Sequence, residues 1–558
     1  MLSPLSMVGE VVMETVIPLL MARIIDVGIA ERNLSYVLTV GLLMVGLSCV
    51  SLAFGALGAR FSAVAALGFS RNLRRRLFRR VQDFSFSNID HFSTSSLVTR
   101  LTTDVTNVQN TYQMIIRMCV RAPFMLISGT IMACFINLRL SSIFFIVIPL
   151  LGAMLTIIAV SAYPRFRAML HQYDLLNGTV QENLIGIRVV KSFVRGSFED
   201  KKFTGAADSV RRTQLAAEKV VILNLPLMQI VVYACIIVSL WFGGRMIVGG
   251  TLLTGELVSF ITYVTQILMS LMMLSMVFVM LVLSRASIAR ITEVLAEEPE
   301  ITSPEGEALS AVKDGSVEFR GVSFSYLKDP SNCVLSDVNL RIQSGQVVGI
   351  LGGTGSSKTT LVSLIPRLYD TTAGSVLVGG ADVRSYGLET LRDSVAMVLQ
   401  KNVLFSGTIR ENLRWGNAQA SDEELKTACI AADADEFVST LPDGYDTQLG
   451  QGGVNLSGGQ KQRLCIARAL LKKPRILILD DSTSAVDTAT DARIRSALRN
   501  SLPQTTKIII AQRIASVQDA DVIYVLDNGR INGSGTHEEL LRTNSIYREV
   551  YESQQSEN

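Results

Sequence analysis

Six long apolar segments place the strongest constraint on how this chain can fold. They all precede residue 290 and lie near 8–30, 36–59, 112–137, 140–163, 220–243 and 256–284. A helix needs about 20 apolar residues to cross the hydrocarbon core of a bilayer, and each segment is long enough. The first is the weakest, because it contains four charged residues. We predict an α-helical membrane domain of six helices over residues 1–298.

Composition indicates that a second, soluble domain follows. Hydrophobic residues make up 49% of the 558 residues and charged residues 18%, which is too apolar for a soluble protein and too polar for a purely intramembrane one. The net charge of +3 argues against a broad electrostatic field for nucleic acid, so we expect no nucleic-acid partner. None of the seven cysteines forms a CxxC pair, and neither a zinc site nor a disulfide framework is predicted.

The arginine-rich stretch 71–84, RNLRRRLFRRVQDF, orients the membrane helices. Its six arginines place the connection between the second and third segments on the cytoplasmic side. By parity the connection over 164–219 is cytoplasmic too. Both connections are long and have a helical pattern, so we expect the helices to continue well beyond the bilayer.

The character of the chain changes near residue 299. Residues 299–315 are acidic and contain prolines, which is typical of a linker. From 316 to 558 short apolar runs alternate with helical stretches. This alternation predicts an α/β domain with a largely parallel core sheet.

A glycine-rich motif, GGTGSSKTT at 352–360, carries the first chemical signal. It follows the apolar strand VVGIL and opens a helix, the context that a phosphate-binding loop of a P-loop NTPase requires. Backbone N–H groups would surround the phosphates of ATP, Lys358 would reach phosphate oxygens, and the Thr359 hydroxyl would bind Mg²⁺. The predicted nucleotide-binding residues of the loop are Gly352, Gly353, Thr354, Gly355, Ser356, Ser357, Lys358, Thr359 and Thr360.

A second motif, LSGGQKQR at 456–463, identifies a family together with the first. The domain resembles the nucleotide-binding domain of ABC transporters, and the whole chain resembles a half-transporter of the exporter type. The resemblance implies that Tyr326 stacks on adenine and that Gln400 contacts Mg²⁺. It also makes Asp480 the magnesium-associated carboxylate, so that the implied metal ligands are Thr359, Gln400 and Asp480.

The resemblance further implies a head-to-tail pair of nucleotide-binding domains. Each ATP then lies between the phosphate loop of one chain and the LSGGQ segment of the other. Ser457, Gly458, Gly459 and Gln460 would therefore bind a nucleotide held by the partner chain.

Two catalytic positions depart from the family pattern. Asp481 stands where the family usually has a glutamate that polarises the attacking water. Its stem is shorter by one C–C bond, about 1.5 Å, and a misplacement of about 1 Å can slow a reaction on the order of 10²-fold. Gln512 stands at the switch histidine and has no proton-linked charge near neutral pH. We expect slow hydrolysis at a site whose catalytic residues are Asp481 and Gln512.

Ser357 is a third departure, because the family usually has a glycine at this position. All three departures fall on one nucleotide site, at Ser357, Asp481 and Gln512, whereas the LSGGQ segment is intact. This asymmetry resembles the degenerate-site subunit of a heterodimeric multidrug-type ABC exporter. Its partner would be a second, non-identical half-transporter that supplies the catalytic Walker motifs. Two alternatives stay open: a homodimeric exporter with low ATPase activity, and an ATP-gated regulatory or channel subunit that does not pump.

The expected location is a bacterial cell membrane, crossed several times, with the nucleotide-binding domain in the cytoplasm. The substrate class stays broad: a hydrophobic or amphipathic drug, lipid or peptide moved out of the cytoplasm. An importer is disfavoured because the membrane and nucleotide domains are fused in one chain. Charged residues in or near the membrane segments are candidates for substrate contact or for an interfacial position: Glu10, Glu14, Arg23, Asp26, Arg117, Arg121 and Arg245.

Overall fold

A computed structural model describes residues 2–304, 306–353, 355–481 and 487–556. Two compact units make up the chain. One comprises the residues up to Gln82 together with Thr94–Glu297, and the other comprises Asp83–Ser93 and Glu298–Asn558. The short segment Asp83–Ser93, which interrupts the first unit in sequence, therefore packs with the second.

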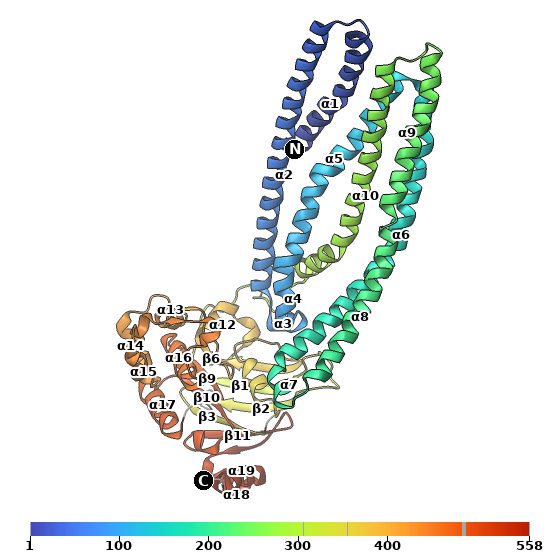
Figure 1. The fold of residues 1–558 in the computed structure, drawn as a ribbon. Coiled ribbons are helices and arrows are strands. Elements are labelled where there is room, and N and C mark those ends of the chain that lie inside the picture. Colours follow the sequence, from blue (N-terminus) through green and yellow to red (C-terminus); the bar gives the residue numbers. More distant parts are fainter. Residues whose placement is uncertain (1, 305, 354, 482–486, 557–558) are drawn as a thin grey trace. The chain divides into compact units, whose positions relative to one another are not determined.

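The first unit is helical and confirms the predicted six membrane helices. Among the described residues, six helices are long and apolar enough to cross a membrane (Figure 1). The long helices are α1 (Leu2–Arg23), α2 (Leu34–Asp83), α5 (Val105–Ile136), α6 (Leu138–Ile185), α9 (Asn224–Val248) and α10 (Thr254–Ala296). Further helices extend or join them: the 26-residue α8 (Gly196–Val221), the short helices α4 (Thr94–Thr99) and α7 (Ile187–Ser192), and the π-helices η1 (Ile24–Ile29) and η2 (Arg100–Asp104).

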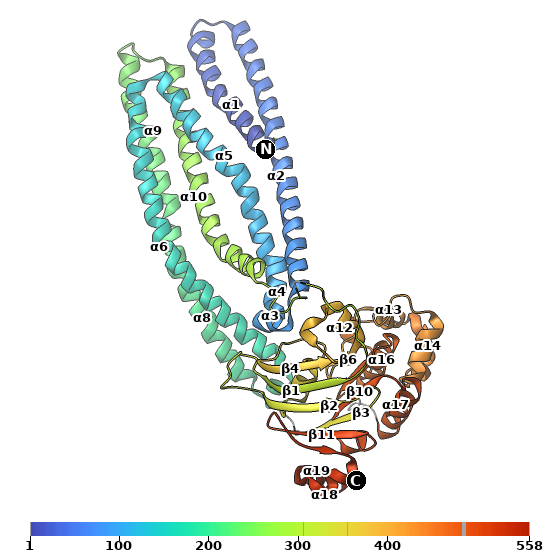
Figure 2. The same ribbon diagram turned by 180° about the vertical axis from the view of Figure 1, so that it is seen from behind.

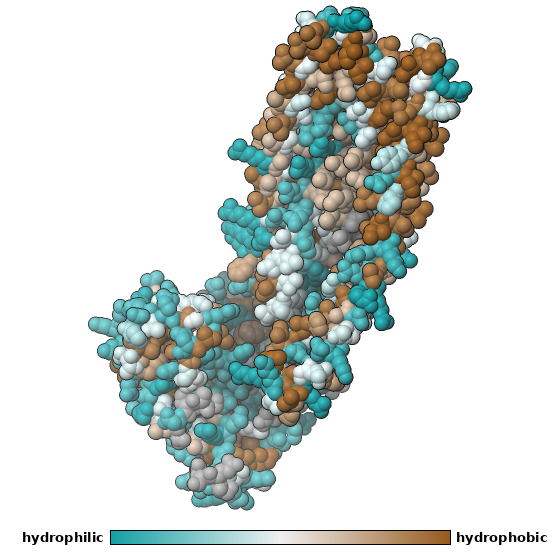
Figure 3. All heavy atoms as spheres, viewed as in Figure 1, coloured by the Kyte–Doolittle hydropathy of each residue, from teal (hydrophilic) through white to brown (hydrophobic). Residues whose placement is uncertain are grey.

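Several of these helices are much longer than a bilayer is thick. Helix α2 has 50 residues, which corresponds to about 75 Å at 1.5 Å per residue, against a hydrocarbon core of about 30 Å. Within this unit hydrophobic side chains gather over the upper part of the helices in Figure 3, and hydrophilic ones over the lower part. The long helical connections expected from the sequence are confirmed.

The weak first segment is helical because its charges have partners. Two carboxylates in α1, Glu10 and Glu14, pair with Arg121 of α5 at 3.2 and 2.9 Å. Such pairing lowers the cost of placing ionisable groups in a membrane segment. These contacts between α1 and α5 thus stabilise the segment 8–30, whose charged residues made it the weakest of the six predicted membrane helices.

The second unit is the predicted α/β domain with a largely parallel core sheet. Its six-stranded sheet has the order β12-β11-β3-β10-β9-β6, and only β11 and β12 are antiparallel neighbours. The strands are β3 (Val347–Leu351), β6 (Val395–Val398), β9 (Ile476–Asp480), β10 (Thr506–Ala511), β11 (Val522–Asp527) and β12 (Arg530–Gly535). An antiparallel sheet of order β2-β1-β4-β5 is formed by β1 (Val317–Phe324), β2 (Leu335–Ile342), β4 (Ala373–Val378) and β5 (Ala381–Asp382). The two-stranded ribbon consists of β7 (Gly407–Thr408) and β8 (Gln448–Leu449).

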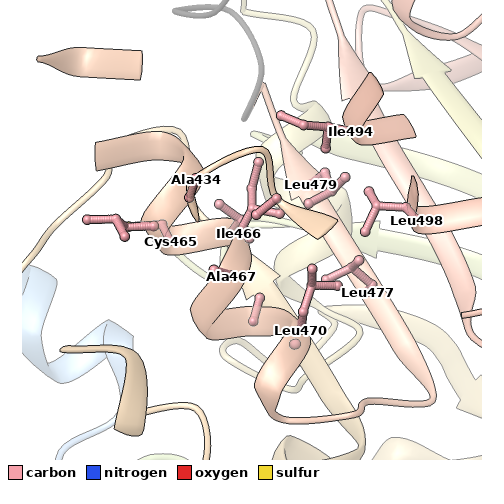
Figure 4. Packing of buried hydrophobic residues seen from close by; sticks show 14 of the residues in the cluster. Ala434, Cys465, Ile466, Ala467, Leu470, Leu477, Leu479, Ile494 and Leu498 are labelled. Atoms are coloured by element: carbon pink, nitrogen blue, oxygen red, sulfur yellow. The ribbon is translucent and has the colours of Figure 1, made fainter. Parts of the chain in front are cut away.

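Figure 2 shows the helices of this unit gathered mainly on one side of the strands and near the C-terminus. The described helices of this unit are α3 (Phe86–His91), α11 (Lys358–Ser363), α12 (Leu388–Ser394), α13 (Ile409–Arg414), α14 (Asp422–Ala431), α15 (Asp435–Thr440), α16 (Gly458–Leu471), α17 (Thr488–Ser501), α18 (His537–Thr543) and α19 (Ser545–Ser556). Figure 4 shows how Ile466 and Leu470 of α16 pack towards Leu477 and Leu479 of β9. These side chains are almost fully buried, so this face of α16 is fixed against the strand that ends in Asp480.

Candidate functional site

The parallel register brings four separate motifs to one edge of the core sheet. Asp480 at the end of β9 is aligned with Ile510 of β10, and Leu351 at the end of β3 is aligned with Ala511. Strand β6 runs parallel to β9 on its other side. Because the carboxyl ends of parallel strands meet at the same edge, the loops that follow these strands converge there.

A cavity of about 360 Å³ lies at this edge. Ten predicted site residues line it: Gly355, Ser356, Ser357, Lys358, Thr359, Thr360, Gln400, Asp480, Asp481 and Gln512. Val334 and Ile510 line it as well. Sequence reasoning did not select these two, because an apolar residue in or beside a strand carries no motif. The volume is within the usual range for small-molecule sites.

The phosphate loop closes tightly over the start of α11. Gly352 has no room for a side chain, since a Cβ would lie 2.3 Å from the Leu526 carbonyl oxygen. The Lys358 ammonium donates to the carbonyl oxygens of Gly352 and Gly353, both at 2.8 Å, and to Ser356 Oγ at 3.2 Å. The lysine thus lies over its own loop, where phosphate oxygens would compete for the same N–H groups. The predicted residue Thr354 lies outside the described residues.

Ser357 adopts a left-handed backbone conformation with φ 71° and ψ 25°. Glycine adopts this conformation without strain, whereas other residues incur a cost of roughly 1 kcal/mol or more. The loop therefore keeps the backbone geometry suited to glycine although the sequence places serine there.

The predicted metal ligands form an oxygen-rich corner of the cavity. Thr359 Oγ1 donates to Asp480 Oδ2 at 2.7 Å, and Asp480 is 2% exposed. Burial raises the pKa of Asp480, and the neighbouring Asp481 charge raises it further. Burial also lowers the pKa of Lys358, against the opposing effect of the two carboxylates. A hydroxyl and a carboxylate are hard ligands of the kind that Mg²⁺ prefers, with phosphate and water oxygens completing its shell.

Asp481 is oriented by two neutral amides. Gln512 Nε2 donates to Asp481 Oδ2 at 3.1 Å, and Gln400 Nε2 lies 3.5 Å from the same oxygen. Gln462 of α16 donates to the Asp481 carbonyl at 3.3 Å, a contact that no sequence motif indicated. Asp481 also has a positive φ of 47°. The two catalytic candidates, Asp481 and Gln512, therefore touch each other through a neutral amide.

Tyr326 and the LSGGQ segment lie outside the residues that line the cavity. The Tyr326 hydroxyl is 2.9 Å from Thr360 Oγ1, and its ring is half exposed. Ser457 caps α16: its Oγ accepts from the Gln460 N–H at 3.3 Å, and its own N–H donates to Gln460 Oε1 at 2.9 Å. The exposed Gly458 and the half-buried Gly459 lie in the first turn of α16. This helix N-terminus is well suited to an anion.

Comparison with known proteins identifies the family. The family described as the ABC transporter transmembrane region matches residues 1–292, and the family described as ABC transporter matches residues 335–484. An uncharacterized ABC transporter ATP-binding protein of Bacillus subtilis, YfiB, is 39% identical over 98% of this chain and 95% of its own length. The ATP-dependent lipid A-core flippase of Desulfotalea psychrophila is 33% identical over 87% of this chain and 84% of its own length.

A third relative and a solved structure extend the comparison. The mitochondrial potassium channel ATP-binding subunit of Mus musculus is 34% identical over 87% of this chain and 68% of its own length. The structure of a bacterial Atm1-family ABC exporter with ATP bound superposes with a TM-score of 0.86, at 26% identity, over 99% of this chain and 97% of the other. The protein belongs to the ABC transporter family, as a multi-pass membrane half-transporter with the exporter fold, in which the membrane domain and the ATP-binding domain are fused in one chain.

Proposed function

We propose that this chain is the degenerate-site subunit of an asymmetric ATP-driven exporter. Its own site, built on Lys358, would bind ATP with Mg²⁺ and turn it over slowly. Its LSGGQ residues would complete the catalytic site of a second, non-identical half-transporter. We also propose that the membrane domain ends at residue 298 and that the linker ends at residue 315. The proposed location is a bacterial cell membrane.

The observation that carries this proposal is the contact between Asp481 and the neutral amide of Gln512. The carboxylate is held by Gln512 at 3.1 Å, and the chain's three histidines, His91, His171 and His537, lie elsewhere in the sequence. A base near a reacting water acts efficiently only when its position is held to within a fraction of an ångström. The aspartate is shorter than glutamate by about 1.5 Å, and a glutamine cannot stabilise a developing charge as an imidazolium would.

The residues of the site have separate proposed roles. Lys358 and the loop N–H groups would hold the phosphates, and the half-exposed Tyr326 ring would stack on the base. Thr359, Asp480 and Gln400 would hold Mg²⁺, which would offset phosphate charge when bound. Asp481 and Gln512 would orient the attacking water poorly, so that ATP stays bound while the partner's site turns over.

The substrate class we propose is hydrophobic or amphipathic. Support comes from the apolar upper surface of the helical unit and from the relative named as a lipid A-core flippase. A drug-like molecule, a lipid and an apolar peptide all belong to this class. Function does not follow from the fold alone, and only transport assays distinguish these three.

Two experiments test the proposal. The first is the native mass, with subunit identification, of the complex purified from its own membrane. Two different chains of similar size are expected, and two copies of this chain would contradict the asymmetric assembly. The second is Asp481→Asn, which should change steady-state ATP hydrolysis by less than about twofold, because catalysis occurs mainly at the other site. Complete loss of hydrolysis would show that Asp481 is the working base.

A second candidate function is an ATP-gated channel or regulatory subunit. The relative named as a mitochondrial potassium channel ATP-binding subunit favours it, and so does slow hydrolysis at the Asp481 site. Accumulation of a hydrophobic dye against its gradient in inverted vesicles, dependent on ATP and on the partner chain, would exclude this candidate.

A further inference from the structure

Tyr369 joins two parts of the nucleotide unit that are far apart in sequence. Its hydroxyl donates to Asp90 Oδ2 of the short helix α3 at 2.7 Å, across a sequence separation of 279 residues. On its other side, the ring of Tyr369 meets the ring of Tyr326 edge to face, with centroids 5.4 Å apart. The same tyrosine therefore contacts α3 and the aromatic residue beside the phosphate loop.

The chain of contacts continues to the phosphate loop. The Tyr326 hydroxyl is 2.9 Å from Thr360 Oγ1, one residue after the proposed magnesium ligand. Phe324 is 3% exposed and packs against both tyrosine rings, which limits their movement. Its ring centroid lies 4.9 Å from that of Tyr326 and 5.6 Å from that of Tyr369. A shift of the half-exposed Tyr326 ring would therefore displace Tyr369 instead of being absorbed locally.

Helix α3 holds the chain segment that follows α10. Asn88, which is 1% exposed, donates to the Glu298 carbonyl at 3.0 Å and accepts from the Glu300 N–H at 3.2 Å. Phe86 adds an edge contact to the Tyr369 ring at 6.0 Å. Because α10 ends at Ala296, α3 contacts the first residues beyond the last membrane helix.

We propose that Tyr369 is a positioning residue through which base binding at Tyr326 fixes helix α3, and with it the start of the segment that follows α10. The inference rests on the proposed function, since it needs a nucleotide base on the Tyr326 ring. When a base stacks there, the ring is held, Tyr369 is held against it, and the bond to Asp90 orders α3. Burial and this bond both raise the pKa of Tyr369, so its hydroxyl remains a donor at physiological pH.

The test is hydrogen exchange on the full complex in nanodiscs, with and without AMP-PNP and Mg²⁺. In the native protein the nucleotide should slow amide exchange both in the loop 355–363 and in 83–93. Tyr369→Phe keeps the ring but removes the bond to Asp90. This variant should leave the nucleotide-dependent slowing at 355–363 unchanged and should abolish the slowing at 83–93. In the native protein we expect the slowing at 83–93 to be about tenfold, in line with a hydrogen bond to a charged acceptor.

Three further variants separate positioning from a merely structural role. Asp90→Ala should match Tyr369→Phe and add nothing to it, whereas Asp90→Asn, which keeps an acceptor oxygen, should retain most of the slowing. Tyr386→Phe is the matched control, because this buried hydroxyl donates to the Val378 carbonyl at 2.7 Å and not to α3; it should behave as the native protein.

The outcomes are distinguishable. If Tyr369→Phe speeds exchange at 83–93 equally with and without nucleotide, the bond is only an anchor and the inference is wrong. If nucleotide slows exchange at 355–363 but not at 83–93 in the native protein, the inference fails and the proposed function stands. If neither segment responds to nucleotide, both fail.

Discussion

At the scale of single residues, Ser357 shows the cost of a departure from the family pattern. Its φ of 71° is a conformation that glycine adopts freely. Ser357→Gly should therefore raise the melting temperature of the nucleotide-free protein by a few degrees, in line with a gain of about 1 kcal/mol. Ser363→Gly, in the helix α11, is the matched control and should lower it. A fall in both variants would contradict the strain at Ser357.

Asp480 gives a pH-dependent prediction. Its raised pKa means that the folded chain holds the proton more tightly than the unfolded chain, whose pKa is near 3.8. Stability therefore falls as pH rises from that value through the folded pKa, and the cost is greatest above the folded pKa.

Asp480→Asn removes this cost while keeping an acceptor for the Thr359 hydroxyl. It should raise the melting temperature of the nucleotide-free protein at pH 7 by a few degrees, and the gain should shrink as pH falls towards 3.8. The same variant should lose the extra stabilisation that Mg²⁺ adds to bound nucleotide. Asp443→Asn, at an exposed carboxylate, should change neither quantity.

At the scale of elements, a polar network around the buried Asp104 joins η2 and α10. Asp104, at the end of η2, is fully buried, and its carboxylate accepts from Arg290 Nε at 2.8 Å and from Ser287 Oγ at 2.8 Å. Arg100 donates to the Arg290 carbonyl at 2.9 Å. These bonds fix the C-terminal part of α10 to η2, the π-helix that leads into α5.

Asp104→Ala should destabilise the helical unit by about 1–3 kcal/mol, because the buried Ser287 hydroxyl loses its acceptor. The Arg290 side chain is 45% exposed and can be solvated by water, so it adds little to this cost. Thermal unfolding followed by circular dichroism measures this loss. Asp208→Ala removes an exposed carboxylate paired with Arg211 three residues away and should cost less than about 0.5 kcal/mol. Equal effects of the two variants would argue against a buried network.

What the sequence could predict at this scale depended on how local each signal is. The six apolar segments and the strand–loop–helix around Lys358 are continuous in sequence, and both were found. The pairs Asp104–Arg290 and Asp90–Tyr369 join residues 186 and 279 positions apart, and neither residue of a pair stands in a motif that names its partner. Charge and length alone could not have matched them.

The same limit applied to the site. Asp480, Asp481 and Gln512 were found through the resemblance to the family, whose motifs place them at or just after the end of an apolar strand, and parallel pairing brings them together. No sequence pattern predicts that Gln512 donates a hydrogen bond to Asp481 or that Ser357 adopts a left-handed backbone conformation.

At the scale of the whole molecule, the positions of Lys358 and Ser457 allow one decisive comparison. Lys358 lines the cavity, whereas Ser457 caps α16 outside the residues that line it. In a homodimer each of the two ATP sites would contain both residues. In an asymmetric pair, the slow site contains this chain's Lys358, and the fast site contains this chain's Ser457.

Lys358→Ala and Ser457→Arg should therefore differ in their effect on ATP hydrolysis by the purified complex. On the proposed arrangement, Ser457→Arg would put a bulky cation at the helix N-terminus beside the partner's nucleotide, and it should reduce hydrolysis by on the order of 10²-fold or more. Lys358→Ala should weaken nucleotide binding at this chain's own site and leave most of the hydrolysis intact. Lys401→Ala, at an exposed lysine near Gln400, is a control for loss of charge and should have little effect on either quantity. If both site variants abolish hydrolysis equally, each site needs both residues from identical chains, and the homodimer is the correct assembly.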